Sequence, residues 1–217
     1  MGPHARPATV TVTRPAGREA ELVERLRAEG HTVHHVPLVA IEPLGDEPVA
    51  VDGYDWVVLT SAVGARELRR RMTGTPRRVA AIGRATAEAF GGADVVAPTS
   101  TQEGLLEALP PDTGRVLFAG AEGARRLLPE TLGADVVALY RTVPLRPERW
   151  PACDLVVLAS PSAAAAYGAL AETAPAVSIG PETTGAAHAA GVEVLAEAAT
   201  SDVDGLVDAV GTALAAS

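Results

Sequence analysis

The sequence has no lysine, a single cysteine and very few aromatic residues, which make up 3% of its 217 positions. The lone cysteine, Cys153, excludes an intrachain disulfide and indicates a reducing compartment. Its place beside an expected strand favours core packing over a nucleophilic role. So few aromatic rings give little support to a base-stacking surface, and a net charge of −9 argues against a nucleic-acid partner.

Long hydrophobic runs are missing too, although hydrophobic residues make up 47% of the chain. The longest apolar stretches have the length of a β-strand, so we expect no transmembrane helix and no membrane partner. No signal-peptide pattern opens the chain, which predicts a cytoplasmic protein. At this length the chain can form one large domain or two domains of about 100 residues each.

Motifs that hold cofactors are also absent. The chain has no G-x-G-x-x-G, no G-x-x-x-x-G-K-[ST] and no G-x-S-x-G. Its only histidine cluster is His31, His34 and His35. On a strand, His31 and His35 would face one way and His34 the other, so the three would not converge on a metal. We therefore expect neither a metal nor a cofactor.

Arginine supplies all of the positive charge, and no arginine follows Arg149. An anionic ligand would therefore be held by earlier arginines or by backbone N–H groups. The run Arg69-Arg70-Arg71 is predicted to end a helix, where basic side chains interact favourably with the helix dipole. We expect this run to form solvated surface rather than a binding site.

What the chain does contain is an internal repeat, in which three short segments recur in the same order. The pairs are Asp55–Ala62 with Asp154–Pro161, Val79–Thr86 with Ala176–Thr183, and Thr99–Leu106 with Thr200–Val207. A weaker pair, Val10–Pro43 and Arg115–Pro147, runs strand, helix, strand and then a proline-punctuated extended stretch. We call Val10–Pro43 segment A and Arg115–Pro147 segment A′, and we call residues 55–106 and 154–207, which hold the three stronger pairs, segments B and B′. The order along the chain is therefore A, B, A′, B′, and the extended stretches are predicted to connect two domains.

Short apolar runs between helical patterns predict fully buried strands. They are Thr9–Thr13, Val33–Val36, Trp56–Thr60, Val79–Ile82, Asp94–Ala97, Val116–Ala119, Asp135–Ala138, Leu155–Ala159, Ala176–Ile179 and Val192–Leu195. Strands that alternate with short helices indicate parallel sheets. Ten strands are more natural as two five-stranded domains than as one sheet. A helix over Arg18–Glu29 would bury Leu22, Val23 and Leu26.

Hydroxyl groups, glycines and arginines gather just after the predicted strands. In open parallel sheets, ligands bind beyond the C-terminal ends of strands, where loops lead into helix N-termini with exposed N–H groups. Such places suit carboxylates or phosphates. The candidate binding residues are Thr13, Arg14, Thr60, Ser61, Gly83, Arg84, Ser160, Ser162, Gly180 and Thr183. At any one position the alternative is that Ser61 or Ser160 only caps a helix and that a glycine only turns the chain.

Taken in order, several of these segments resemble the uroporphyrinogen-III synthase family. They are Val12–Pro15, Pro37–Ile41, Leu59–Ala62, Ile82–Thr86, Ala138–Thr142, Ser160–Ser162 and Ser178–Thr183. Each segment alone is a weak signal, whereas the ordered set, from Thr9 to Val210, is specific. The chain departs from the family at Thr184, where a small residue is frequent, and Glu182 would add negative charge near an anionic ligand.

The resemblance implies an α/β fold of two flavodoxin-like parallel-sheet domains joined by a two-stranded β connector. One domain would be discontinuous, residues 1–36 plus 148–217, and the other contiguous, residues 49–138. The connector would occupy residues 37–48 and 139–147, with strands Pro37–Leu44 and Leu139–Arg146. A would then fold with B′, and B with A′, and the ligand would bind in a cleft between the domains.

The resemblance also implies a lyase that cyclises hydroxymethylbilane to uroporphyrinogen III, with loss of water and inversion of the last pyrrole ring. This step of tetrapyrrole biosynthesis, which leads to haem, sirohaem and cobalamin, needs no cofactor. Tyr140 matches the family's connector tyrosine and is the candidate catalytic residue, a donor to the leaving hydroxyl. The alternative is a tyrosine packed at the domain hinge. We expect a monomer that receives its substrate from hydroxymethylbilane synthase.

Two other functions fit the residues without the resemblance. A two-lobed, non-catalytic protein could close on a small anionic ligand, or a flavodoxin-like module could hold a nucleotide or flavin at the Thr60-Ser61 turn. The lack of an export signal argues against the first function. The shortage of aromatic rings argues against the second.

Overall fold

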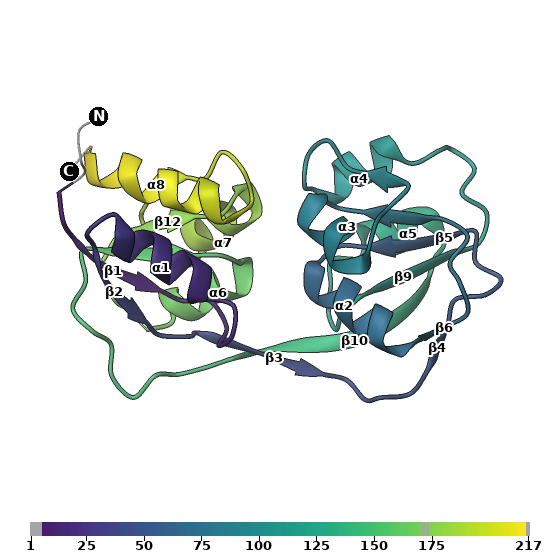
Figure 1. Cartoon of the computed structure of the whole chain (residues 1–217), viewed down its shortest axis with the longest axis horizontal. Helices are drawn as coiled ribbons and strands as arrows, with labels where there is room; N and C mark the ends of the chain where they lie inside the picture. Colours follow the sequence, from purple (N-terminus) through teal and green to yellow (C-terminus); the bar gives the residue numbers. More distant parts are fainter. Residues whose placement is uncertain (1–5, 171, 173, 216–217) are drawn as a thin grey trace. The chain divides into compact units, whose positions relative to one another are not determined.

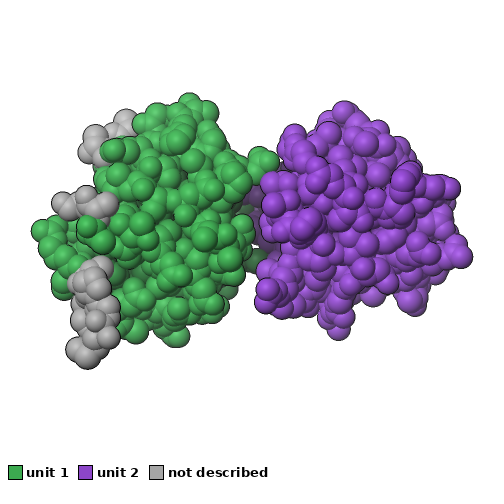
Figure 2. All heavy atoms as spheres, turned by 90° about the horizontal axis from the view of Figure 1, so that it is seen from above, with its two compact units in different colours: residues 1–40, 143–217 green, residues 41–142 purple. Residues whose placement is uncertain are grey.

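The computed structural model describes residues 6–170, 172 and 174–215. The chain divides into two compact units, residues 1–40 with 143–217 (unit 1) and residues 41–142 (unit 2), which Figure 2 colours green and purple. The predicted discontinuous domain falls within unit 1 and the predicted contiguous domain within unit 2. Residues 1–5, 171, 173, 216 and 217 of the predicted discontinuous domain lie outside the described residues.

Unit 1 is built on a five-stranded sheet with strand order β13-β12-β11-β1-β2, in which every pair is parallel (Figure 1). Its elements are β1 (Thr9–Val12), α1 (Ala20–Ala28), β2 (Thr32–His35), β11 (Leu155–Leu158), α6 (Pro161–Gly168), β12 (Ala176–Ser178), α7 (Pro181–Ala189), β13 (Val194–Glu197) and α8 (Val203–Ala215). The α/β class with parallel sheets, predicted from the alternation of strands and helices, is confirmed.

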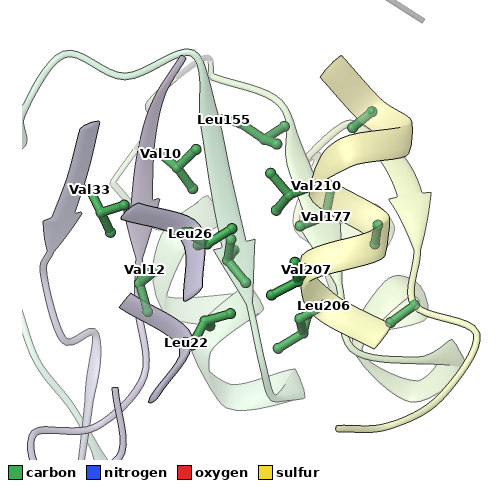
Figure 3. Packing of buried hydrophobic residues seen from close by; sticks show 14 of the residues in the cluster. Val10, Val12, Leu22, Leu26, Val33, Leu155, Val177, Leu206, Val207 and Val210 are labelled. Carbon is green, nitrogen blue, oxygen red and sulfur yellow. The ribbon is translucent and has the colours of Figure 1, made fainter. Parts of the chain in front are cut away.

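Helices cover both faces of this sheet, which is why its central strand β11 is apolar and buried throughout. On one face, Leu22 and Leu26 of α1 and Leu206 of α8 pack in the same cluster as Val12 and Leu155 (Figure 3). On the other face, α6 and α7 bury Val156 and Leu158 of β11, and Cys153 packs against that cluster. The predicted packing role of the cysteine and the predicted buried face of α1 are both confirmed.

Unit 2 contains the second large sheet, with strand order β3-β10-β9-β5-β7-β8. Its elements are β3 (Val39–Pro43), β4 (Val49–Ala50), β5 (Trp56–Leu59), α2 (Ala62–Arg71), β6 (Met72–Thr73), β7 (Val79–Ala81), α3 (Arg84–Phe90), β8 (Val95–Val96), α4 (Gln102–Ala108), β9 (Val116–Ala121), α5 (Leu127–Leu132) and β10 (Asp135–Pro144). Helices α2 and α3 cover one face, and α4 and α5 cover the other. The small parallel pair β4 and β6 had no sequence signal.

The two sheets have the same layout in space but start at different points of the chain. In unit 1 the neighbours run β2-β1-β11-β12-β13, and in unit 2 they run β10-β9-β5-β7-β8. The strands of segments A and A′ therefore occupy the same two places, and those of B′ and B the same three. One contact repeats as well: Asp154 Oδ2 accepts the Thr9 N–H at 2.8 Å, and Asp55 Oδ2 accepts the Arg115 N–H at 3.0 Å. Unit 2 is thus a circular permutation of unit 1.

The chain passes from one unit to the other along β3 and β10, which lie side by side. The Leu44 N–H donates to the Leu139 carbonyl at 2.9 Å, and the Leu145 N–H donates to the Leu38 carbonyl at 2.8 Å, so the strands are antiparallel. The sequence predicted a strand over Asp135–Ala138 and a separate connector strand over Leu139–Arg146. That separation is wrong, because β10 is continuous from Asp135 to Pro144.

Three further expectations need correction. The predicted strand Val192–Leu195 lies two residues later, as β13. His31 precedes β2 instead of belonging to it and is buried, and neither ring nitrogen has a partner among the described residues. Arg71 is not solvated surface: it is 8% exposed and bonds to backbone carbonyls. Within the described ranges, no helix has the length and apolar character needed to span a bilayer.

The fold makes opposite predictions for two helical glycines. A Cβ at Gly168 of α6 would lie 2.6 Å from both the Cβ and the carbonyl oxygen of Ala190, whereas a Cβ at Gly211 of α8 would meet nothing within 4 Å. Gly168→Ala should therefore destabilise the protein by about 1–3 kcal/mol through overpacking. Gly211→Ala should stabilise it by about 0.5–1 kcal/mol, because alanine favours helix. Thermal unfolding of both variants checks this; shifts of the same sign would contradict the α6–α7 packing.

Candidate active site

The predicted site residues lie at the C-terminal ends of the parallel strands within each unit. In unit 2, Thr60 and Ser61 follow β5, Gly83 and Arg84 follow β7, and Tyr140 lies in β10. In unit 1, Thr13 and Arg14 follow β1, Ser160 and Ser162 follow β11, and Gly180 and Thr183 follow β12. Loops that lead from these strand ends into helices leave N–H groups at the helix starts, where anions bind in open sheets.

The closest association of predicted residues is that of Tyr140 with Ser61. Their hydroxyl oxygens lie 2.8 Å apart, and the Tyr140 side chain is buried in the core of unit 2. Ser61 is the N-cap of α2, as predicted, and its Oγ accepts the Gly64 N–H at 3.0 Å. With that N–H bond made, Ser61 can donate its own proton to the tyrosine oxygen. The pair therefore joins the turn after β5 to the connector strand β10.

A β-bulge directs Tyr140 towards this turn. In the parallel pair β9–β10, Ala138 lies opposite Gly120 and Tyr140 lies opposite Ala121, so Leu139 is an extra residue in β10. Bulges re-aim the following side chains and are common next to active sites. Gly64 allows the close approach on the other side, since a Cβ there would lie 3.2 Å from Ser61 Oγ and 3.3 Å from the Ala119 carbonyl oxygen.

The two Ile-Gly turns have matching neighbours that the sequence interpretation did not single out as site residues. A Cβ at Gly83 would lie 2.8 Å from Ser100 Oγ, and a Cβ at Gly180 would lie 3.3 Å from Ser201 Oγ. Because each N-cap residue is a glycine, no N-cap side chain accepts a hydrogen bond from the first N–H groups of α3 or α7. Each turn thus combines uncapped helix N–H groups with a serine hydroxyl. The recurrence of the Thr-Ser pair in the repeat, at 99–100 and 200–201, was the signal that could have identified these serines.

The two candidate arginines, Arg14 and Arg84, differ in exposure. Across residues 6–170, 172 and 174–215, neither guanidinium forms a hydrogen bond or a close ion pair with another described residue. Arg14 is half-buried, and burial lowers the pKa of its guanidinium, an effect that the carboxylates of Glu21 and Glu19 oppose. Arg84 is exposed in the first turn of α3. Both cations are thus available to an anionic ligand at a strand end.

The remaining predicted residues of unit 1 are bound into the structure of that unit. The Thr13 hydroxyl is buried and donates to the Val157 carbonyl at 2.7 Å, which ties β1 to β11. Ser160 caps α6, as predicted, and its Oγ lies 3.2 Å from that of Ser162. Thr183 is buried in α7. Ser160 and Ser162 are the second pair of predicted residues that the structure brings together.

Thr184, the departure from the family pattern, is held within its own unit. Its hydroxyl contacts the Ser178 hydroxyl, the Gly180 carbonyl and the Glu197 carboxylate. The Glu197 carboxylate therefore lies beside the loop that follows β12, next to the N–H groups at the start of α7. Among the described residues, no three His, Cys, Asp or Glu side chains come together as a metal site requires.

Comparison with known proteins gives concordant results. The profile of the family described as "Uroporphyrinogen-III synthase HemD" matches residues 20–208. A uroporphyrinogen-III synthase of Synechococcus elongatus is 30% identical over 173 residues, 69% of this chain and 66% of that protein. A putative uroporphyrinogen-III synthase of Methanocaldococcus jannaschii is 27% identical over 147 residues, 61% of each protein. The matches thus span slightly less than two thirds of the length of these curated relatives.

A solved structure has a similar fold. It is that of a mutant uroporphyrinogen III synthase from Thermus thermophilus, with a TM-score of 0.65 and 17% identity, covering 96% of this chain and 99% of that one. At this identity the likeness shows the fold alone. The profile match includes residues of both units and every predicted site residue except Thr13 and Arg14. By that match over most of its length, the chain belongs to the uroporphyrinogen-III synthase family.

Proposed function

We propose that the protein catalyses the cyclising dehydration of hydroxymethylbilane to uroporphyrinogen III, with inversion of the last pyrrole ring. The observation that carries the proposal is the family match over residues 20–208. The proposal includes a cytoplasmic monomer that receives its substrate from hydroxymethylbilane synthase. Its two units are two flavodoxin-like domains, 1–36 plus 148–217 and 49–138, joined through 37–48 and 139–147. The order of the unit 1 strands, 2-1-3-4-5 in chain order within the unit, supports the flavodoxin-like description.

The substrate carries an acetate and a propionate on every ring, so the protein must hold many carboxylates. Arg14 and Arg84 supply two cations with no ion pair among the described residues. The uncapped starts of α3 and α7 supply N–H groups beside Ser100 and Ser201. Charge-assisted hydrogen bonds from N–H groups to carboxylates are stronger than neutral ones. In our proposal these groups, together with Thr60, Ser160 and Ser162, bind the substrate, whereas Thr183 is too buried to reach it.

The main chemical task is to direct the ring closure, and activation of the leaving hydroxyl is secondary. Loss of the hydroxyl as water leaves an azafulvene cation, which in solution closes without inversion. The enzyme must fold the chain so that the substituted carbon of the last ring attacks first, through a spiro intermediate. Positioning of this kind can lower the activation barrier by several kcal/mol. The rigid strand ends of the two sheets are suited to such positioning.

Tyr140 is proposed to donate a hydrogen bond to the leaving hydroxyl. A phenol with a reference pKa of about 10 is a weak acid, so it serves as donor and orienter rather than as the sole proton source. Ser61 supports this role, because it accepts the Gly64 N–H and can donate to the tyrosine oxygen. The phenol proton is then directed to another acceptor. The bulge at Leu139 sets the direction of the side chain.

The direct test is incubation with enzymatically generated hydroxymethylbilane, followed by isomer analysis of the product. We expect the type III isomer, formed faster than the spontaneous type I isomer and equally well after exhaustive chelation and dialysis. The control is the same mixture without the protein, compared at equal substrate consumption. Type I product at the uncatalysed rate would refute the proposal. Activity restored only by an added metal or nucleotide would refute its cofactor-free form.

Tyr140→Phe separates a catalytic tyrosine from one that only packs. The ring is retained and the hydroxyl removed, so we expect kcat to fall roughly ten- to a hundredfold. The melting temperature should fall by only a few degrees, since one neutral hydrogen bond contributes about 1 kcal/mol. Tyr54→Phe is the matched control, because its hydroxyl bonds to Asp135 at the opposite ends of the strands. Wild-type rate and isomer purity in Tyr140→Phe would leave this residue with a structural role alone.

Single replacement of Arg14 or Arg84 by Ala tests the carboxylate contacts. Each change should reduce kcat/KM by roughly five- to thirtyfold, equivalent to about 1–2 kcal/mol. The loss is limited because backbone N–H groups also bind the substrate carboxylates. More type I isomer should appear as released substrate closes spontaneously. Arg77→Ala is the control, since Arg77 pairs with Asp55 before β5 begins. Equal kinetics in all three variants would remove both arginines from the site.

A further inference from the structure

Arg71, the last residue of α2, is a buried cation that the proposed reaction does not use directly. Its side chain donates from Nε to the Glu47 carbonyl at 3.0 Å and from Nη1 to the Leu44 carbonyl at 2.9 Å. Within the described part of the chain it forms no ion pair with a carboxylate. Removing a guanidinium from water is costly unless its donors find partners. A buried arginine that donates to two backbone carbonyls therefore holds the backbone that carries them.

The backbone in question is the segment 44–47, which follows the connector strand β3. Arg70 contacts the same segment from the solvent side, where it pairs with Asp46 at 2.7 Å and with Glu67 at 2.9 Å. The Arg70–Asp46 pair, which holds the segment, is largely exposed, and exposed pairs contribute little to stability. Arg71 is thus the buried attachment of this segment to α2, and Arg70 is a neighbouring exposed one.

Leu44 links this attachment to Tyr140. Its carbonyl accepts from Arg71, and its N–H donates to the Leu139 carbonyl at 2.9 Å. Leu139 is the extra residue of the bulge that directs Tyr140. Ser61, the N-cap of α2, thus contacts Tyr140 directly, whereas Arg71, at the other end of α2, contacts Leu44, which in turn bonds to Leu139. All of these contacts lie within unit 2.

We propose that Arg71 is a positioning residue for Tyr140, acting through Leu44 and the Leu139 bulge. Its kinetic part rests on the proposed function, whereas its structural part does not. Arginine suits this role because its planar fork presents several donors in fixed directions, and here two of them meet carbonyls three residues apart in sequence. Lysine has a single flexible ammonium, so we expect it to restore the attachment only in part.

The structural part is tested by amide hydrogen exchange of the full chain. In Arg71→Met, which keeps an apolar stem without donors, protection of the Leu44 N–H should fall at least tenfold, because its carbonyl is no longer held. In Arg70→Met it should stay within twofold of wild type, and Arg71→Lys should lie between. Equal protection in Arg71→Met and Arg70→Met would overturn the proposal. If Arg71→Met does not fold, Arg71→Lys against Arg70→Lys serves as the comparison, with the same outcomes decisive.

The kinetic part is tested by a double-mutant cycle with Tyr140→Phe. Alone, Arg71→Met should lower kcat at least fivefold, with KM within twofold. In the Tyr140→Phe background it should lower kcat less than twofold, because there is no hydroxyl left to position. Arg70→Met should leave kcat unchanged in both backgrounds. Independent, multiplicative losses would overturn the proposal, whereas a wild-type protein without type III activity would refute the proposed function and leave the exchange result standing.

Discussion

The pairing of β1 with β11 is the constraint on which the rest of the architecture depends. It places Val10 beside Leu155 in a parallel sheet, so segments from before and after the middle of the chain must form one unit. The middle then closes its own sheet by pairing β5 with β9. Because each unit takes strands from two repeat segments, the chain has to cross between the units twice. The strands β3 and β10 make those crossings and pair with each other.

The candidate active site follows from this crossing. A strand that only completed a sheet could end at its last paired residue, but β10 is ten residues long and extends beyond Tyr140, which lies opposite Ala121, the last residue of β9. The bulge at Leu139 absorbs the change of register and turns the phenol towards the N-cap of α2. Ser61 therefore has two functions in one hydroxyl: it caps the helix and it holds the tyrosine.

Some arginines stabilise the structure, and others are available to a ligand. Exposed arginines such as Arg115 pair with carboxylates at the opposite end of the strands, where Asp135 also accepts from Tyr54 and its pKa is lowered mainly by the Arg115 bond. Arg71 is buried and serves the backbone. Arg14 and Arg84, by contrast, have no ion pair in the described ranges, although the chain is acidic overall. Both lie at strand ends, where the N–H groups of helix starts also favour anionic ligands.

The sequence by itself indicated most strands of the two large sheets, the N-caps Ser61 and Ser160, and the repeated order A, B, A′, B′, because short apolar runs, N-cap serines and matching turns are local signals. It also identified the family, since the ordered motifs span the chain. Tertiary structure alone decided that β10 is continuous, that Leu139 is a bulge, and that Ser61 meets Tyr140 from 79 residues away. Arg71 shows the reason most clearly. Its neighbours Arg69 and Arg70 are exposed, and a run of three arginines cannot reveal which one faces a segment 24 to 27 residues earlier. Burial of a charge depends on what folds over it, and that is set by the packing of distant segments rather than by local composition.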